Sequence, residues 1–320
     1  MRTSFYRFYL AMLGFLFIVQ GTTLAQEERK SLPAISIDRM RADVKYLASD
    51  LLQGRGVGTR GEELATDYIA DQFQKAGLKP AGENGTYFQK VPLVMVKSGP
   101  DLSLQMINKE ENIPFKLSEE FVGVSYSQKS EDFQADAVFV GHGISAPEFG
   151  WDDYRDTDVK GKVVVLYTNE PPSDDPKFFG GKSLTYYGRW TYKYEEATRR
   201  GAKAVLIIHT PETAGYPYSV VQNVKEAQLQ RDPDEPALAF AGWLSSRGGE
   251  KLLATIGLTV DEAIKKADSR GFKPIPLGVQ LKMHVPTTVT KIISKNVLGM
   301  VEGSDPTLKL EYVLFRSSVV

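Results

Sequence analysis

The chain has 320 residues, of which 42% are hydrophobic and 25% are charged, and its formal net charge is −1. This composition is typical of a globular protein with room for about two domains, and it lacks the cationic excess of proteins that bind nucleic acid. Because the chain has no cysteine, disulfides, thiolate metal sites, a cysteine nucleophile and lipid attachment at cysteine are excluded.

The first 25 residues have the pattern of a secretory signal peptide. Arg2 and Arg7 precede an apolar run over residues 8–19, and the small residues at 23–25 offer a cleavage point before Gln26. The run is short for a membrane span, although an uncleaved anchor is the alternative. We therefore predict an exported protein, periplasmic in a bacterium or secreted, with no stable membrane anchor after cleavage.

Two amphipathic helices are predicted next, on either side of a glycine-rich turn. Apolar residues recur at intervals of three and four over residues 36–52, with Ser36 or Asp38 near the cap, and again in the stretch that Gly77 ends. The turn at residues 56–61 matches the dinucleotide fingerprint G-x-G-x-x-G, but a helix leads into it where that fingerprint needs a strand. This order favours a helix-loop-helix entrance to a domain over a nucleotide site.

The rest of the chain alternates between predicted strands and helices. A strand over residues 87–94 is expected to be weakened or ended by Pro92, and residues 98–118 give no clear pattern. Residues 163–208 read as strand, helix and buried strand, which predicts a crossover unit with parallel strands. The other predicted strands are 137–140, 237–240, 277–285, 287–293, 296–301 and 311–315, and the predicted helices are 189–200, 249–256 and 260–267.

Three segments carry a family resemblance in the same order along the chain. Residues 46–94 include LQGRGVGTRGEELATDYIADQFQKAGLKPAG, residues 137–209 include VFVGHGISAPEFGWDDYRDTDVKGKVVVLY, and residues 295–315 read KNVLGMVEGSDPTLKLEYVLF. Together they resemble the amino-terminal part of secreted zinc-dependent aminopeptidases of the co-catalytic two-zinc exopeptidase family (the M28 type). The middle segment resembles the protease-associated domain that is inserted into that catalytic domain.

The resemblance implies an α/β fold, the amino-terminal piece of a zinc-exopeptidase α/β sandwich with an inserted protease-associated α/β domain. It implies zinc as cofactor and peptides as substrates of the intact family. The expected division is a signal peptide at 1–25, the first part of the peptidase domain at 26–120, the insert at 121–276, and returning peptidase strands at 277–320.

The resemblance also implies a missing metal site. In the family, the strand that matches residues 311–315 leads into a His-x-Asp-His motif, whereas here residues 316–320 read RSSVV. No catalytic, cofactor-binding or metal-binding residue is carried over, so we expect a truncated peptidase chain that is inactive and binds no zinc. The alternative is a non-catalytic protease-associated module that binds peptides or proteins.

The three histidines, His142, His209 and His284, do not have the spacing of zinc ligands on one helix face. His142 lies between two glycines after a strand and is expected in a turn. His209 ends a buried strand and is expected to cap a loop. His284 lies in the polar phase of an alternating strand and is expected to face solvent. These interpretations are favoured over metal binding by any of the three.

Two further motifs are weak signals. Asp152, Asp153, Asp156 and Asp158 form an acidic cluster without the alternation and closing glutamate of a calcium loop, so a solvated loop is predicted. Residues 123–127, with Ser125 at the centre, lack the last glycine of G-x-S-x-G and its strand-to-helix setting.

Aromatic residues are dense between the two predicted buried strands, 163–167 and 204–208. They could form a ligand-facing surface, but packing beneath a long loop is favoured. Arg55 and Arg60 flank the glycine turn, where a structural salt bridge is favoured over orientation of a substrate carboxylate. The aromatic residues are Phe178, Phe179, Tyr186, Tyr187, Trp190, Tyr192 and Tyr194.

Overall fold

The computed structural model describes residues 35–317 except residue 110 and residues 223–225, so the predicted signal peptide lies outside the described residues. The chain divides into two units, residues 1–54 and residues 55–320. In the first unit, helix α2 (Ile37–Leu47) is capped by Ser36, whose Oγ accepts a hydrogen bond from the Arg39 amide. None of the described helices has the length and apolar run that a membrane crossing requires.

The second unit begins with helix α3 (Arg60–Lys75), which follows the glycine-rich turn. A 3-10 turn, η1 (Asp50–Arg55), leads into those glycines, so the chain has no strand at the place where the dinucleotide fingerprint requires one. The helix ends as predicted at Gly77, which has a φ of 78°, and the Leu78 amide donates to the Phe73 carbonyl.

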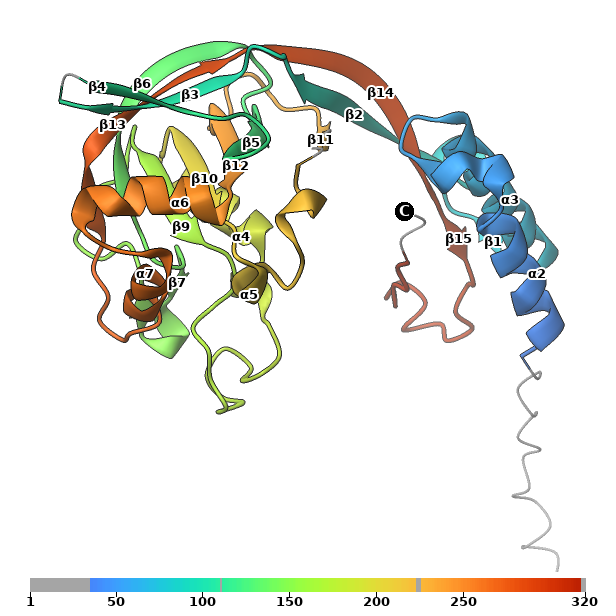
Figure 1. The fold of residues 1–320 in the computed structure, drawn as a ribbon. Helices are drawn as coiled ribbons and strands as arrows, with labels where there is room; N and C mark the ends of the chain where they lie inside the picture. Colours follow the sequence, from blue (N-terminus) through green and yellow to red (C-terminus); the bar gives the residue numbers. More distant parts are fainter. Residues whose placement is uncertain (1–34, 110, 223–225, 318–320) are drawn as a thin grey trace, which may run out of the picture. The chain divides into compact units, whose positions relative to one another are not determined.

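A long antiparallel ladder joins two segments that are far apart in the sequence. Strand β2 (Phe88–Ser98) pairs with β14 (Thr287–Val297) over the whole length of both (Figure 1). Pro92 does not end β2, because β11 (Glu226–Leu229) pairs only with residues 93–96 on the other side. At Pro92, β2 therefore has one neighbouring strand, and the missing N–H is tolerated. The short strands β1 (Lys79–Pro80) and β15 (Gly299–Met300), which lie just before β2 and just after β14 in the chain, pair with each other in antiparallel orientation.

An eight-stranded mixed sheet forms between these two segments, in the order β4-β3-β13-β6-β9-β10-β12-β5. Four of its strands, β6, β9, β10 and β12, run parallel to their neighbours in this group, as the predicted crossover requires. The fold is therefore α/β, as predicted. The strands are β3 (Ser103–Asn108), β4 (Glu111–Phe115), β5 (Phe121–Val124), β6 (Glu131–Phe139), β9 (Val163–Tyr167), β10 (Ala204–Ile208), β12 (Phe240–Leu244) and β13 (Ile275–Val285).

Helices cover both faces of the parallel strands. On one face, Val163, Val165 and Leu206 pack with apolar residues of the helices α6 (Ser246–Leu253) and α7 (Val260–Ala267). On the other face, Val164 and Val205 pack with Tyr194 and Ala197 of α4 (Trp190–Arg199). Because both faces are buried, these strands are continuous apolar runs in the sequence. The remaining short elements are η2 (Glu83–Gly85), β7 (Ser145–Ala146), η3 (Pro147–Phe149), β8 (Trp151–Asp152), η4 (Tyr186–Gly188), α5 (Pro211–Ala214), η5 (Tyr218–Val220) and η6 (Ala254–Ile256).

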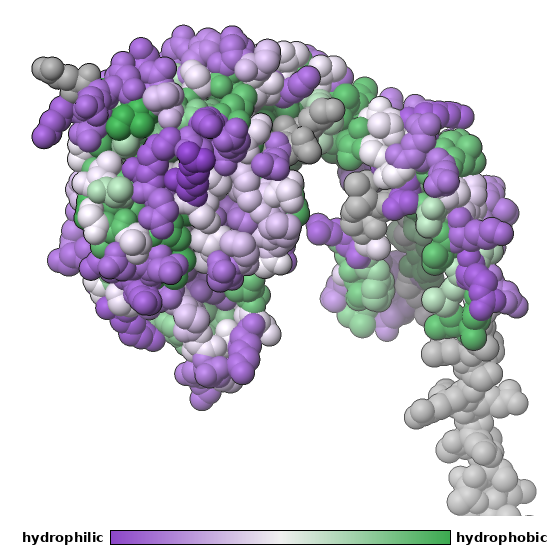
Figure 2. Space-filling model, in the orientation of Figure 1, coloured by the Kyte–Doolittle hydropathy of each residue, from purple (hydrophilic) through white to green (hydrophobic). Residues whose placement is uncertain are grey.

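Two strand predictions from the sequence need correction, and residues 98–118, for which no element was predicted, form strands. Residues 98–118 contain the hairpin of β3 and β4, and the strand predicted at 237–240 lies at residues 240–244. The strand predicted at 311–315 is irregular and pairs with no described strand. Its apolar side chains are exposed, with Val313 at 84% and Phe315 at 91%, and the segment shows a green surface near the label C of Figure 1 (Figure 2). A strand needs a neighbouring strand for its backbone hydrogen bonds.

Strands β3, β4 and β13 belong to the same sheet as the strands of the predicted insert. The chain enters and leaves this sheet at adjacent points, where the Gly99 amide donates to the Pro286 carbonyl at 2.8 Å. The domain boundaries at 120 and 276 stay a prediction.

Candidate functional site

Polar side chains gather where the parallel strands end. His142 follows β6, Glu170 follows β9, His209 follows β10 and Ser245 follows β12, and all four are buried. In open α/β sheets, ligands bind at the carboxyl ends of the strands. This edge, which we call the carboxyl edge, is therefore the expected position of a ligand site.

A fully buried lysine lies at the centre of the carboxyl edge. Lys193 of α4 donates from Nζ to the carbonyls of Asn169 and Tyr187, each at 2.7 Å. Burial lowers the pKa of Lys193 to about 7, against the opposing influence of Asp153 and Glu170. Sequence reasoning missed both Lys193 and Glu170. The signal for Lys193 is its position four residues before the buried Ala197, on the inner face of the helix.

Asp153 is the second buried charge and corrects the prediction of a solvated acidic loop. Its carboxylate accepts hydrogen bonds from the Ile144 amide at 3.0 Å and from the indole Nε1 of Trp151 at 2.8 Å. Burial raises its pKa to about 6, and His142 and Lys193 oppose that rise. Asp152 is half-buried, and Asp156 and Asp158 are exposed. The prediction of a solvated loop is therefore wrong only for Asp153, whose neighbours Trp151 and Tyr154 are also buried.

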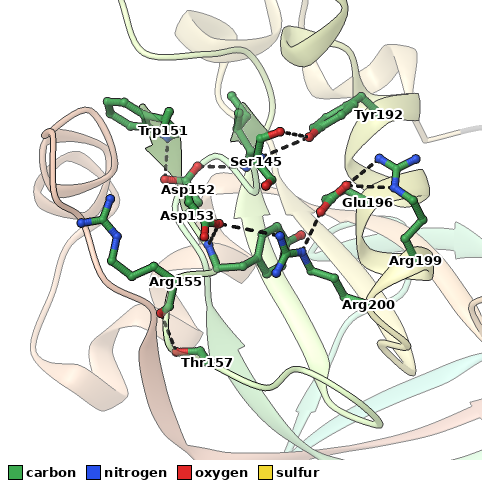
Figure 3. Close-up of polar contacts among 12 residues, drawn as sticks. Ser145, Trp151, Asp152, Asp153, Arg155, Thr157, Tyr192, Glu196, Arg199 and Arg200 are labelled. Carbon is green, nitrogen blue, oxygen red and sulfur yellow. Dashed lines mark hydrogen bonds and ion pairs between the residues drawn. The ribbon is translucent and has the colours of Figure 1, made fainter. Parts of the chain in front are cut away.

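The loop that carries Asp153 is fixed to helix α4 by a second set of contacts (Figure 3). The Tyr192 hydroxyl lies 3.1 Å from both the amide nitrogen and the carbonyl oxygen of Ser145. Arg200, held by Glu196 of the same helix, reaches the loop: its guanidinium lies 4.3 Å from the centre of the Tyr154 ring and 3.7 Å from Asp152 Oδ1. These contacts orient α4, and with it Lys193.

His142 lies in a turn as predicted, because Gly141 and Gly143 both have positive φ. Its ring is buried between two elements: Nε2 lies 2.8 Å from Asp268 Oδ1 at the end of α7, and Nδ1 lies 3.3 Å from the Thr168 carbonyl. Both ring nitrogens therefore have protein partners. The contact ties α7 to the carboxyl edge.

His209 is buried among aromatic rings. The centroids of Tyr216, Tyr218 and Trp243 lie 5.4, 5.5 and 5.9 Å from its own. Burial lowers its pKa. Among the described residues, its Nε2 has no hydrogen-bond partner. The backbone carbonyl of His209 accepts from the hydroxyl of Ser246, which starts α6, so the residue joins strand to helix as the loop-capping prediction expected.

His284 faces solvent, as predicted, and lies between two carboxylates. Its Nδ1 is 2.6 Å from Asp132 Oδ1 and its Nε2 is 3.2 Å from Asp101 Oδ2. Both contacts raise the pKa of His284. A raised folded-state pKa means that this stabilisation is complete below the unfolded value of about 6.5 and is lost as the pH rises through the folded value.

An NMR titration should show this effect directly. We expect the imidazole signals of His284 to titrate above pH 6.5, and the substitution Asp132→Asn to move the midpoint down because it removes the closer anion. His209 in the same spectra is the internal control and should titrate below pH 6.5. An unchanged His284 midpoint in Asp132→Asn would contradict the assignment.

The other sequence candidates have structural partners. Ser125 is buried and its Oγ lies 3.0 Å from Ser127 Oγ. Arg60 forms the predicted salt bridge, with Glu63 at 2.8 Å, and Arg55 has a φ of 57°. Most of the aromatic group packs inward as favoured, and Tyr186 and Trp190 are partly exposed. The inward rings are Phe178, Phe179, Tyr187 and Tyr192, which pack with Phe149 and Trp151, and Tyr194, which packs with Tyr126.

The residues of the described ranges do not fit a zinc site. They include no group of three histidine or acidic side chains that could hold a metal ion. His142 is engaged on both nitrogens, and His209 and His284 lie in separate environments. A zinc centre needs three or four such ligands around one ion, and the described residues bring no such set together.

Comparison with known proteins gives alignments with solved structures only. No family model and no curated protein matches the sequence. Among solved structures, an aminopeptidase from Aneurinibacillus sp. strain AM-1 aligns with a TM-score of 0.37 at 16% identity over 84% of this chain and 49% of that one. A peptidase M28 precursor from Shewanella amazonensis SB2B aligns with a TM-score of 0.36 at 14% identity, over 83% and 53%. The chain thus spans about half the length of these two structures.

Proposed function

We propose that this chain is the amino-terminal and inserted part of an exported zinc aminopeptidase, a hydrolase that removes residues from the amino ends of peptides. The proposal rests first on the three segments that resemble that family in order. In the proposed protein, residues 26–120 and 277–320 belong to the peptidase domain and residues 121–276 to a protease-associated insert.

The observation that carries the proposal is the ladder between β2 and β14. These strands pair over eleven residues each, although residues 99–286 separate them in the chain. Such pairing is what an inserted domain produces, because the host chain must leave and re-enter at one place. The order of host segment, insert and host segment is the one that the resemblance implies.

Zinc and the catalytic base of the proposed peptidase would come from sequence outside the described residues. When bound, zinc would supply the activated water that attacks a peptide carbonyl. The described residues bring together no group of three side chains that could hold it. Their role in the proposed protein is to build the insert and the strands that support the peptidase domain.

Zinc binding by purified chain 26–320 tests this division. We expect no stoichiometric zinc by metal analysis after dialysis and no release of the amine from aminoacyl-anilides. A longer chain whose sequence beyond residue 315 supplies a His-x-Asp-His motif should bind zinc and release the amine. One bound zinc per chain 26–320, together with hydrolysis, would show that the ligands lie within this chain and would contradict the proposal.

A second candidate function is a non-catalytic module that binds peptides. A cavity of about 470 Å³ favours it, because this volume falls in the range of small-ligand sites. The cavity lies between the β2–β14 ladder and the loops at the amino ends of β6 and β10, away from the carboxyl edge. A peptide titration of the purified chain tests this candidate.

A further inference from the structure

The cavity beside the β2–β14 ladder, which we call the ladder cavity, contains four basic side chains. Lys203 is held by Glu131, whose Oε2 lies 2.6 Å from its Nζ, and Arg231 lies 3.7 Å from Glu235. The other two, Lys129 and Lys291, are exposed and form no ion pair with a described residue. The charge of Lys129 acts on Glu131, which Lys203 already pairs, so neither of these two lysines is neutralised by a direct contact with a described residue.

Arg231 contributes a further positive charge to the lining. One terminal nitrogen of its guanidinium donates to the Pro236 carbonyl at 2.5 Å. Its Nε is buried and has no hydrogen-bond partner among the described residues. Because that nitrogen is enclosed by protein, a ligand in the ladder cavity would contact only the accessible part of the Arg231 side chain.

The acids around the ladder cavity limit what it can hold. Glu131 is neutralised by Lys203 and also accepts from Ser127 Oγ at 2.5 Å, and these contacts lower its pKa against the effect of burial. Asp232 accepts from the Asp234 amide at 3.1 Å, and Glu235 is largely exposed. The carboxylates of Asp232 and Glu235 disfavour a doubly charged anion such as phosphate more than a singly charged carboxylate.

The apolar part of the lining fits the carbon chain of such a ligand. Val94 and Val289 lie on the same face of the ladder as Lys291, because Lys291 is directly opposite Val94 and Val289 is two residues before it. Pro233 and Ala237 close another side. A carboxylate on a short aliphatic stem, as in a glutamate side chain, would meet cations at its tip and valines along its stem.

We propose that the ladder cavity binds an acidic side chain of a peptide, with Lys129 and Lys291 as its donors. This inference deepens the second candidate function and rests on it. The acidic peptide would lie against the β2–β14 ladder. Because Lys129 and Lys291 are exposed, salt should weaken the interaction.

Fluorescence anisotropy of a labelled hexaglutamate peptide, capped at both ends, tests the proposal on purified chain 26–320. We expect saturable binding that weakens with salt, and binding of capped hexaglutamine at least tenfold weaker. The double substitution Lys129→Met with Lys291→Met should weaken hexaglutamate binding about tenfold. The matched control is Lys265→Met with Lys266→Met, which removes two exposed lysines of α7 outside the cavity and should leave binding unchanged.

The outcomes separate the inference from the function on which it rests. Equal binding of hexaglutamate and hexaglutamine, or undiminished binding by the Lys129/Lys291 variant, would overturn the acidic site while peptide binding stands. Inorganic phosphate is then compared, as a competitor, with a simple salt at the same ionic strength. If phosphate displaces hexaglutamate more strongly than that salt does, the preference for a carboxylate is overturned. Binding of neither peptide would contradict the peptide-binding function itself.

Discussion

Replacing the buried Lys193 by methionine is expected to destabilise the chain by about 3 kcal/mol at pH 7. Methionine keeps the length of the side chain but donates no hydrogen bond, so the carbonyls of Asn169 and Tyr187 lose their shared partner. Each buried acceptor left without a donor costs about 1–3 kcal/mol. Urea unfolding followed by circular dichroism measures the loss.

The pH dependence of the same variant separates hydrogen bonding from charge. A neutral amine still has two N–H donors for the two carbonyls, so Lys193 can lose its proton without losing a contact. Because burial lowers its folded-state pKa to about 7, the unfolded chain binds more protons between pH 7 and 9. Wild-type stability should therefore rise through this range relative to Lys193→Met.

Lys265→Met, on the exposed face of α7, is the control and should change the free energy of unfolding by less than about 0.5 kcal/mol. A Lys193→Met chain with wild-type stability at pH 7 and at pH 9 would show that Lys193 does not stabilise the fold.

The parallel core could be predicted because single continuous runs of apolar residues indicate its buried strands. Residues 163–167 and 204–208 are apolar throughout, and Gly201, with a φ of 71°, ends the helix between them. Residues 277–285 alternate because one face of β13 is buried and the other is exposed. In each case the local pattern and the tertiary environment agree.

The elements that sequence reasoning missed are strands or predicted strands whose formation depends on a neighbouring strand. Residues 103–108 and 111–115 form a hairpin at the edge of the sheet, where Pro114 and exposed polar residues are tolerated. Residues 311–315 have strand-forming side chains, but no described strand pairs with them. A residue's propensity is a property of its own segment, whereas a strand is a property of two.

The buried charges were hidden for a related reason. Asp153 is one of four aspartates in a polar stretch, and only its neighbours Trp151 and Tyr154 mark the turn inward. Lys193 is enclosed because α4 and the loop after β9 meet, which no single segment encodes. The ladder cavity could not be predicted from the sequence either, because the residues that line it are spread from 94 to 291.

Phe179 is the aromatic residue whose loss should cost most. Its side chain is fully buried, and the rings of Phe149 and Phe178 lie 4.5 and 4.7 Å away between centroids. Removing a buried phenylalanine ring costs about 3–5 kcal/mol, through lost transfer free energy and the cavity left behind. We expect Phe179→Ala to lose that amount in urea unfolding, whereas Tyr186→Ala, at a ring that is 51% exposed, should lose about 1 kcal/mol or less.

The backbone at Phe179 makes a sharper test possible. Its φ is 49°, a left-handed value that costs a residue with a Cβ about 1 kcal/mol relative to glycine. Phe179→Gly should therefore be more stable than Phe179→Ala, the reverse of the order in a helix or strand. The loop keeps this strained conformation because the ring packs against Phe149, Phe178, Trp151 and Tyr187. An alanine variant more stable than the glycine variant would mean that the strain is absent. A wild-type free energy of unfolding in both would mean that the rings do not support the fold and are free to serve as a ligand surface.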